Sequence, residues 1–88
     1  MLYLVAIQSG TDAAKAEAAM YLRSVSETCC SEFDAIWFVK SDKKAVEIRD
    51  YLMQLLGPNS LVAVALLAGF AAWHGLGADS ETWLLKHL

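Results

Sequence analysis

The chain has 88 residues, of which 57% are hydrophobic and 19% are charged. This length suffices for one domain with one core, and the charged fraction lies below the quarter that is usual in soluble domains. One small core cannot hide that much apolar surface, so we expect part of it to be buried against a partner. The net charge of −3 argues against a dedicated nucleic-acid binder, which would carry a basic excess, but it leaves room for a local basic patch.

The longest apolar run is Ser60–Ala72. As a helix it would cover roughly two thirds of the hydrocarbon core of a bilayer, whereas a strand buried on both faces needs only about five to eight residues. We therefore expect a strand in the middle of a sheet and no membrane span. The opening MLYLVAIQSG has no basic residue and too short an apolar run for a signal peptide, which favours a cytoplasmic protein.

The first half of the chain predicts a strand, a helix and a second strand. Leu2–Gln8 is a short apolar run and predicts a doubly buried strand. Thr11 or Asp12 then caps a helix that runs to about Val25, with alanines giving it high helix propensity. Ser26–Phe33 permits an edge strand, protected by its glutamates. The adjacent Cys29 and Cys30 match neither a disulfide framework nor a zinc spacing, so we expect plain structural thiols.

The second half predicts a strand, a helix, a strand and a C-terminal tail. Ala35–Lys40 is rich in aromatic and β-branched residues and predicts a central strand. Lys43–Leu56 follows Ser41-Asp42 and has the apolar stripe of a helix, which Gly57 ends. The run from Ser60 supplies the last strand, Leu61–Leu67. The tail ends in a short helix, Glu81–His87, capped by Asp79 or Ser80.

The order strand, helix, strand, strand, helix, strand predicts a single α+β domain over residues 1–88, with the ferredoxin-like β-α-β-β-α-β arrangement. Its antiparallel sheet carries both helices on one face. Because the last two long strands are apolar on both sides, the other face must meet the tail or another subunit. We expect a homodimer formed through this open face and the tail, with an interface drawn from Trp37, Val39, Val62, Val64, Trp73 and Trp83.

Three stretches carry a resemblance to a known group: LYLVAIQ at the start, AIWFVKSDKKAVEIRDYL in the middle, and LLAGFAAWHGL followed by TWLLKHL at the end. They resemble the small bacterial proteins called SinR-like. Those proteins are similar in fold to the CRISPR-associated small ferredoxin-like family, the second protein of the spacer-acquisition pair. The resemblance covers nearly the whole chain. It implies a homodimer, with metal-dependent nuclease activity in some members and a DNA-binding scaffold role in others.

The nuclease members of that family carry an aspartate at the end of the first strand. The matching residues in this sequence are Ile7 and Gln8, so the carboxylate is missing. Glu32 or Asp34 would have to replace it in a relocated site. We therefore expect no magnesium-dependent cleavage and assign no catalytic residue, metal ligand or cofactor.

Lys40, Lys43 and Lys44 lie where the second predicted helix begins and form the one candidate site for nucleic acid. Lysine side chains beside the free amides of a helix start can hold a phosphate, but a solvated helix start capped by Asp42 explains the same residues. Three functions stay open. The first is a dimeric, non-catalytic protein with at most weak nucleic-acid binding. The second is a nuclease with a relocated carboxylate, and the third is a ligand-binding or protein-assembly module on the same fold.

Overall fold

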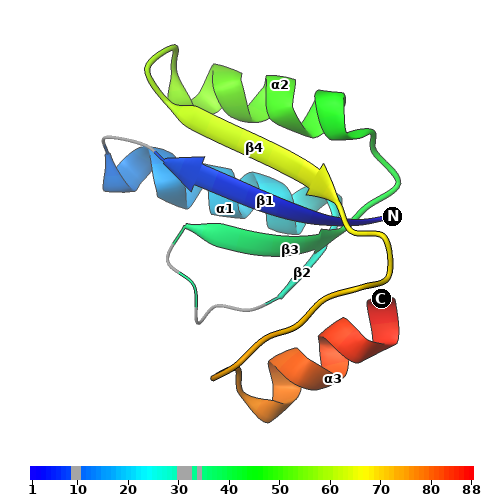
Figure 1. The fold of residues 1–88 in the computed structure, drawn as a ribbon. Helices are drawn as coiled ribbons and strands as arrows, with labels where there is room; N and C mark the ends of the chain where they lie inside the picture. The colour runs from blue at the N-terminus through cyan, green and yellow to red at the C-terminus, as the bar shows by residue number, and fades with distance from the viewer. Residues whose placement is uncertain (9–10, 30–32, 34) are drawn as a thin grey trace.

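The computed structural model describes residues 1–8, 11–29, 33 and 35–88. Within these ranges the chain forms one four-stranded antiparallel sheet and three helices (Figure 1). The α+β class is therefore confirmed. The strands follow one another across the sheet in the order β2-β3-β1-β4. In chain order the elements are β1 (Leu2–Gln8), α1 (Asp12–Val25), β2 (Glu27–Cys29), β3 (Ile36–Lys40), α2 (Ala45–Leu56), β4 (Leu61–Leu66) and α3 (Ala78–His87).

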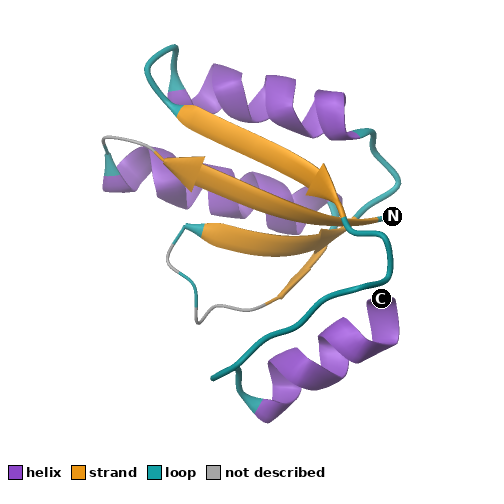
Figure 2. Ribbon diagram, in the orientation of Figure 1, coloured by secondary structure: helices purple, strands orange, loops and turns teal. Residues whose placement is uncertain are grey.

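Helices α1 and α2 lie side by side on one face of the sheet (Figures 1 and 2). The core is the layer between them and the strands. Its buried side chains come from the two central strands and both helices, and they are Tyr3, Val5, Ile7, Ala18, Leu22, Val39, Ile48 and Leu52. Burying this layer on one side leaves the opposite face of the sheet without a helical cover from α1 or α2.

Two of the expected element ends are confirmed by their local geometry. The Thr11 hydroxyl oxygen accepts a hydrogen bond from the Ala14 amide at 3.2 Å, which caps α1 at its start. At the end of α2, Gly57 has a φ of 89° and its amide donates to the Met53 carbonyl at 2.9 Å. A left-handed backbone suits glycine, which pays no steric penalty from a side chain there.

The structure corrects the start of α2, which is at Ala45 and not at Lys43. Residues before it form a tight turn, in which the Lys43 amide donates to the Ser41 hydroxyl oxygen at 3.1 Å. The N-cap is Lys44, not Asp42, and the Lys44 amide donates to the Glu47 carboxylate at 3.4 Å. A carboxylate near the start of a helix also interacts favourably with the helix dipole.

Other bounds differ by less. The structure describes β2 over Glu27–Cys29, and β3 starts at Ile36. Residues 30–32 and 34 of the expected strand and turn, Cys30 included, lie outside the described residues. β4 ends at Leu66, one residue earlier than expected. α3 starts at Ala78, because Gly77 is its N-cap and Asp79 and Glu81 both lie in the first turn.

The position of β4 contradicts the expectation of a strand in the middle of the sheet. β1 and β3 take the two central positions, and β4 pairs only with β1 among the described residues. Leu61 and Leu66 at its two ends are 64% and 58% exposed. An uninterrupted apolar sequence predicts a strand buried on both faces, but here it forms an edge strand.

The C-terminal tail crosses from β4 at one edge of the sheet to β2 at the other, where α3 lies (Figure 1). Within the tail, the Trp73 indole nitrogen donates to the Glu81 carboxylate at 3.0 Å. Leu84 of α3 is fully buried, and His87 Nε2 lies 3.6 Å from the Glu27 carboxylate of β2. None of the described helices is long and apolar enough to cross a membrane.

The two core-covering helices also meet at their outer surfaces. The rings of Tyr21 and Tyr51 stack with centroids 4.1 Å apart and planes 11° from parallel. Burial raises the pKa of Tyr21, and the neighbouring Tyr51 and Glu47 raise it further, because all three disfavour a phenolate. Tyr21 therefore stays neutral throughout the physiological range, and the stack joins α1 to α2 without a charge.

Candidate functional site

The first candidate surface is the face of the sheet that α1 and α2 leave uncovered, here called the open face. Side chains alternate between the two faces of a strand, and Tyr3, Val5 and Ile7 of β1 point into the core. Their neighbours along β1 and the residues paired with those neighbours must share the opposite face. The open face is thus formed by Leu2, Leu4, Ala6, Gln8, Ile36, Phe38, Lys40, Leu61, Ala63 and Ala65. Leu2, at the start of β1, is the one buried residue among them.

The structure places the interface residues expected on β3 and β4 on the helix-covered face of the sheet. Trp37, Val39, Val62 and Val64 pair with the core-facing residues of β1, and all four belong to the helix-covered core or pack against it. Val39 is fully buried there. A partner that covers the open face would instead contact the alternate residues of the same strands. The amino-acid pattern could not decide between the two faces, because both carry apolar side chains.

The two tail tryptophans make contacts within the chain. Trp73 is half-buried and its indole nitrogen is bonded to Glu81. Trp83 is half-buried too, and its ring centroid lies 4.4 Å from that of His87. Both residues therefore help to hold the tail together. Several apolar residues that the sequence analysis did not name as interface residues have a larger exposed fraction than these two tryptophans.

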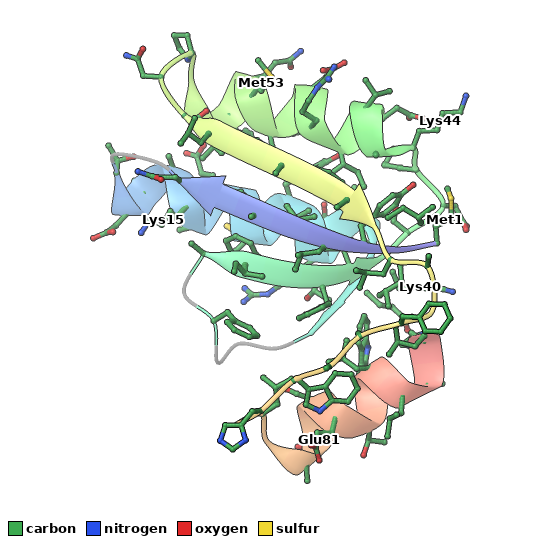
Figure 3. The ribbon with its side chains drawn as sticks, in the orientation of Figure 1. Met1, Lys15, Lys40, Lys44, Met53 and Glu81 are labelled. Carbon is green, nitrogen blue, oxygen red and sulfur yellow. The ribbon has the colours of Figure 1, made fainter. Side chains whose placement is uncertain are left out.

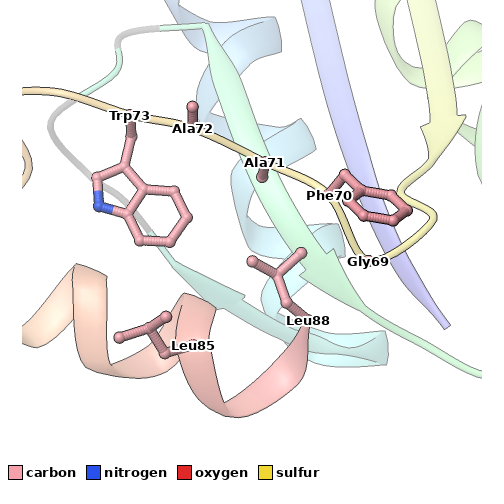
Figure 4. A pocket seen from close by; sticks show the side chains of 7 residues that line it. All are labelled: Gly69, Phe70, Ala71, Ala72, Trp73, Leu85 and Leu88. Carbon is pink, nitrogen blue, oxygen red and sulfur yellow. The ribbon is translucent and has the colours of Figure 1, made fainter.

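Those residues lie on β4 and along the tail. Figure 4 shows a groove between the linker that follows β4 and helix α3, lined by Gly69, Phe70, Ala71, Ala72, Trp73, Leu85 and Leu88. Phe70 is 90% exposed and Leu85 is 70% exposed. A second hollow lies on the open face at the end of β1, with Gln8 as its one polar side chain among apolar neighbours from β3 and β4. The uncovered apolar surface is thus concentrated along β4 and the tail.

The second candidate surface is the expected lysine cluster. Lys40 ends β3, and Lys43 and Lys44 lie in the turn that leads into α2. Figure 3 shows Lys40 and Lys44 at the end of the sheet where Met1 begins β1. The Tyr3 hydroxyl donates to the Lys43 carbonyl at 2.8 Å and fixes this turn against β1. The structure therefore gathers the three lysines at one end of the molecule.

Acidic groups lie close to the same lysines and weaken their field. The Glu47 carboxylate already accepts the Lys44 amide at the start of α2, the place where a phosphate would bind. Glu27 is the cross-strand partner of Lys40, and Asp42 lies between Lys40 and Lys43 in the chain. The cluster is consequently a small and partly compensated basic patch.

The end of β1, where the nuclease members of the resembled family carry aspartate, holds an exposed Gln8. An amide oxygen is a poorer magnesium ligand than a carboxylate. Among the described residues, no three histidine, cysteine, aspartate or glutamate side chains come together as a metal site would need. The alternatives Glu32 and Asp34 lie outside the described residues.

No protein-family model matches the chain, and no curated protein or solved structure matches it either. What the molecule does is therefore inferred from its own surface.

Proposed function

We propose that this chain is a non-catalytic, homodimeric binding module with a ferredoxin-like fold, related to the SinR-like proteins and through their fold to the CRISPR-associated small ferredoxin-like family. The observation that carries the proposal is the uncovered apolar surface along β4, the open face and the tail. Leu61, Leu66, Phe70 and Leu85 are each more than half exposed. Large apolar side chains left exposed to water mark interfaces in soluble proteins where they gather into patches.

The ferredoxin-like assignment is supported by the order of the elements and of the strands. Each β-α-β unit places a helix on the same face, and the two units interleave so that the first and third strands are central. The kinship with SinR-like proteins is supported by the sequence stretches quoted above. The first coincides with β1, and the second covers β3 and the part of α2 from Ala45 to Leu52.

We predict that the purified protein is a homodimer at micromolar concentration. Removing the exposed leucine and phenylalanine side chains from water favours association, and an interface of standard size would bury about 800 Å² on each partner. Light scattering coupled to size exclusion measures the mass directly. A species of twice the chain mass of 9.6 kDa is expected, and a species of the chain mass at every concentration would contradict the proposal.

Weak nucleic-acid binding is the second candidate function, favoured by the gathering of Lys40, Lys43 and Lys44 at one end. Dimer formation doubles the net charge of −3, so the whole molecule repels a polyanion and only the local patch attracts it. Such binding must fall steeply with salt, because it depends on the release of counterions. Binding that does not depend on salt would favour the third function, a ligand-binding or protein-assembly module.

We predict that replacing Lys40, Lys43 and Lys44 together by glutamine abolishes any binding to DNA or RNA, because each lysine lost removes one phosphate contact. Fluorescence anisotropy with labelled oligonucleotides at low and physiological salt measures the effect. A charge-matched control replaces Lys15, Arg23 and Arg49, which are spread over α1 and α2. Equal loss in both variants would show that the patch has no special role.

The nuclease alternative is tested separately. We predict no cleavage of single- or double-stranded DNA or RNA with magnesium or manganese, because Gln8 stands where the carboxylate would have to hold the cation. Incubation with metal against a chelator, followed by electrophoresis, checks this. Metal-dependent cleavage that disappears in Glu32→Gln or Asp34→Asn would instead support a relocated carboxylate.

A further inference from the structure

The backbone of β4 exposes a row of hydrogen-bonding groups at the edge of the sheet. In an antiparallel pair, opposed residues alternate between exchanging both backbone bonds and exchanging none. The Leu67 amide donates to the Leu2 carbonyl at 2.9 Å, and the β1–β4 register continues from there residue by residue. Odd-numbered residues of β4 therefore bond to β1. The amide and carbonyl groups of the even-numbered residues Val62, Val64 and Leu66 point away from it.

The two edges of the sheet are protected very differently. β2, at one edge, carries Glu27 in its described residues and has α3 against it. These are the devices that keep an edge strand from pairing with other chains. β4, at the other edge, has six residues, LVAVAL, with no charge, no proline and no bulge in its register with β1. No described strand pairs with its outer side.

We propose that β4 pairs antiparallel with β4 of a second copy of this chain, which joins the two sheets into one continuous sheet. This inference rests on the proposed self-association and names its geometry. The outward groups belong to every second residue and are spaced symmetrically about Val64, so the strand is complementary to its own copy. Val64 faces Val64 of the partner subunit across a two-fold axis, and Val62 faces Leu66 of the partner subunit, which allows about six backbone hydrogen bonds.

The side chains are compatible with this register. Leu66, which is 58% exposed in one chain, comes beside Val62 of the partner subunit, so two apolar side chains cover each other. On the open face Ala63 comes opposite Ala65 of the partner subunit, and small side chains let the strands approach. No charged residue of this acidic chain lies on β4, so no like charges meet. A six-residue edge is about 20 Å long, which gives an interface at the small end of the specific range and an expected Kd in the micromolar range.

The test removes outward amides without changing the bonds to β1. Leu66→Pro and Val64→Pro each delete one outward donor per chain, because proline has no amide hydrogen. Leu66→Ala and Val64→Ala are the matched controls, which shorten the same side chains and keep the donors. Sedimentation equilibrium over a dilution series measures the Kd, and circular dichroism confirms folding. We expect at least a tenfold weaker dimer for the proline variants than for their alanine controls.

The outcomes separate this inference from the proposed function. A dimer that survives both proline substitutions but is lost in Ile36→Glu, on the open face, overturns edge pairing and keeps self-association. A wild-type chain that stays monomeric overturns both the edge pairing and the proposed homodimer. The edge of β4 would then be a site for a strand of another protein. A dimer that weakens only in the proline variants supports edge pairing.

Cross-linking gives a second measurement that does not need the proline variants to fold. In a Cys29→Ser, Cys30→Ser background, Ala63→Cys combined with Ala65→Cys places cysteines opposite each other across the proposed axis, at a pair without backbone bonds where strands are closest. Mild oxidation is expected to give a covalent dimer. Ala63→Cys alone, the control, has no opposed thiol and should stay monomeric on a denaturing gel. Absence of the cross-link in the folded double variant overturns the register.

Discussion

Replacing Leu52 by alanine is expected to lower the free energy of unfolding by about 2–5 kcal/mol. Leu52 is fully buried on α2, in the core between that helix and the sheet. The loss combines the transfer of the missing carbons with the cavity they leave, because a packed core relaxes only in part. Urea denaturation followed by circular dichroism, at one protein concentration for all variants, measures the change. For a domain of this size the loss would remove a large part of the total stability.

The neighbouring Met53 supplies the control. It is 48% exposed on the outer side of the same helix, and alanine has a higher helix propensity than methionine. Met53→Ala is therefore expected to stay within about 0.5 kcal/mol of the wild type. Similar losses for both variants would mean that α2 does not use Leu52 to hold the sheet.

Replacing Leu84 by alanine is expected to detach the C-terminal helix while the sheet and its two covering helices stay folded. Leu84 is fully buried, although it lies outside the main core cluster. Among the described residues, the other contacts of α3 are chiefly those with β2. A loss of about 2–5 kcal/mol at this one residue would exceed what the remaining contacts supply. Hydrogen exchange should show loss of protection over residues 78–87 and retained protection in β1 and β3.

Leu85, next in the chain and 70% exposed, is the matched control for that experiment. Leu85→Ala should leave the exchange of α3 unchanged, because its side chain has little burial to lose. Global unfolding in Leu84→Ala would show instead that the tail and the sheet form one cooperative unit. Equal loosening in both variants would show that helix propensity, and not burial, keeps α3 in place.

Much of the fold could be predicted because local signals were strong. The cap at Thr11, the helix end at Gly57 and the strand over Leu2–Gln8 follow from clear local signals, and the structure confirms these three. The expected burial of that strand on both faces is wrong, because Leu4, Ala6 and Gln8 are not buried. The starts of α2 and α3 were displaced by two and three residues respectively. There the competing groups, Ser41 and Gly77, act through hydrogen bonds and backbone angles that a pattern of side chains does not reveal.

The position of each strand in the sheet was harder to predict. An apolar run such as Leu61–Leu66 has the same sequence pattern in a central strand and in an edge strand. The hydrophobic pattern does not indicate how many strands pair with it. The face on which Trp37 and Val39 lie could not be predicted for the same reason, because both faces of β3 are apolar. One signal could have located the edge: in a split β-α-β arrangement the last strand lies outside the first.

The uncharged sequence of β4 also has a consequence for the unfolded chain. Segments of six or seven residues with high β propensity, little charge and no proline stack readily into cross-β fibrils. Residues 61–66 carry no charge and no proline, and they form a strand in the folded chain. When heat exposes them, aggregation competes with refolding, and the apparent melting temperature then varies with protein concentration and with heating rate. The thermal tolerance of this protein is consequently a matter of kinetics, set by how long the strand stays docked on β1.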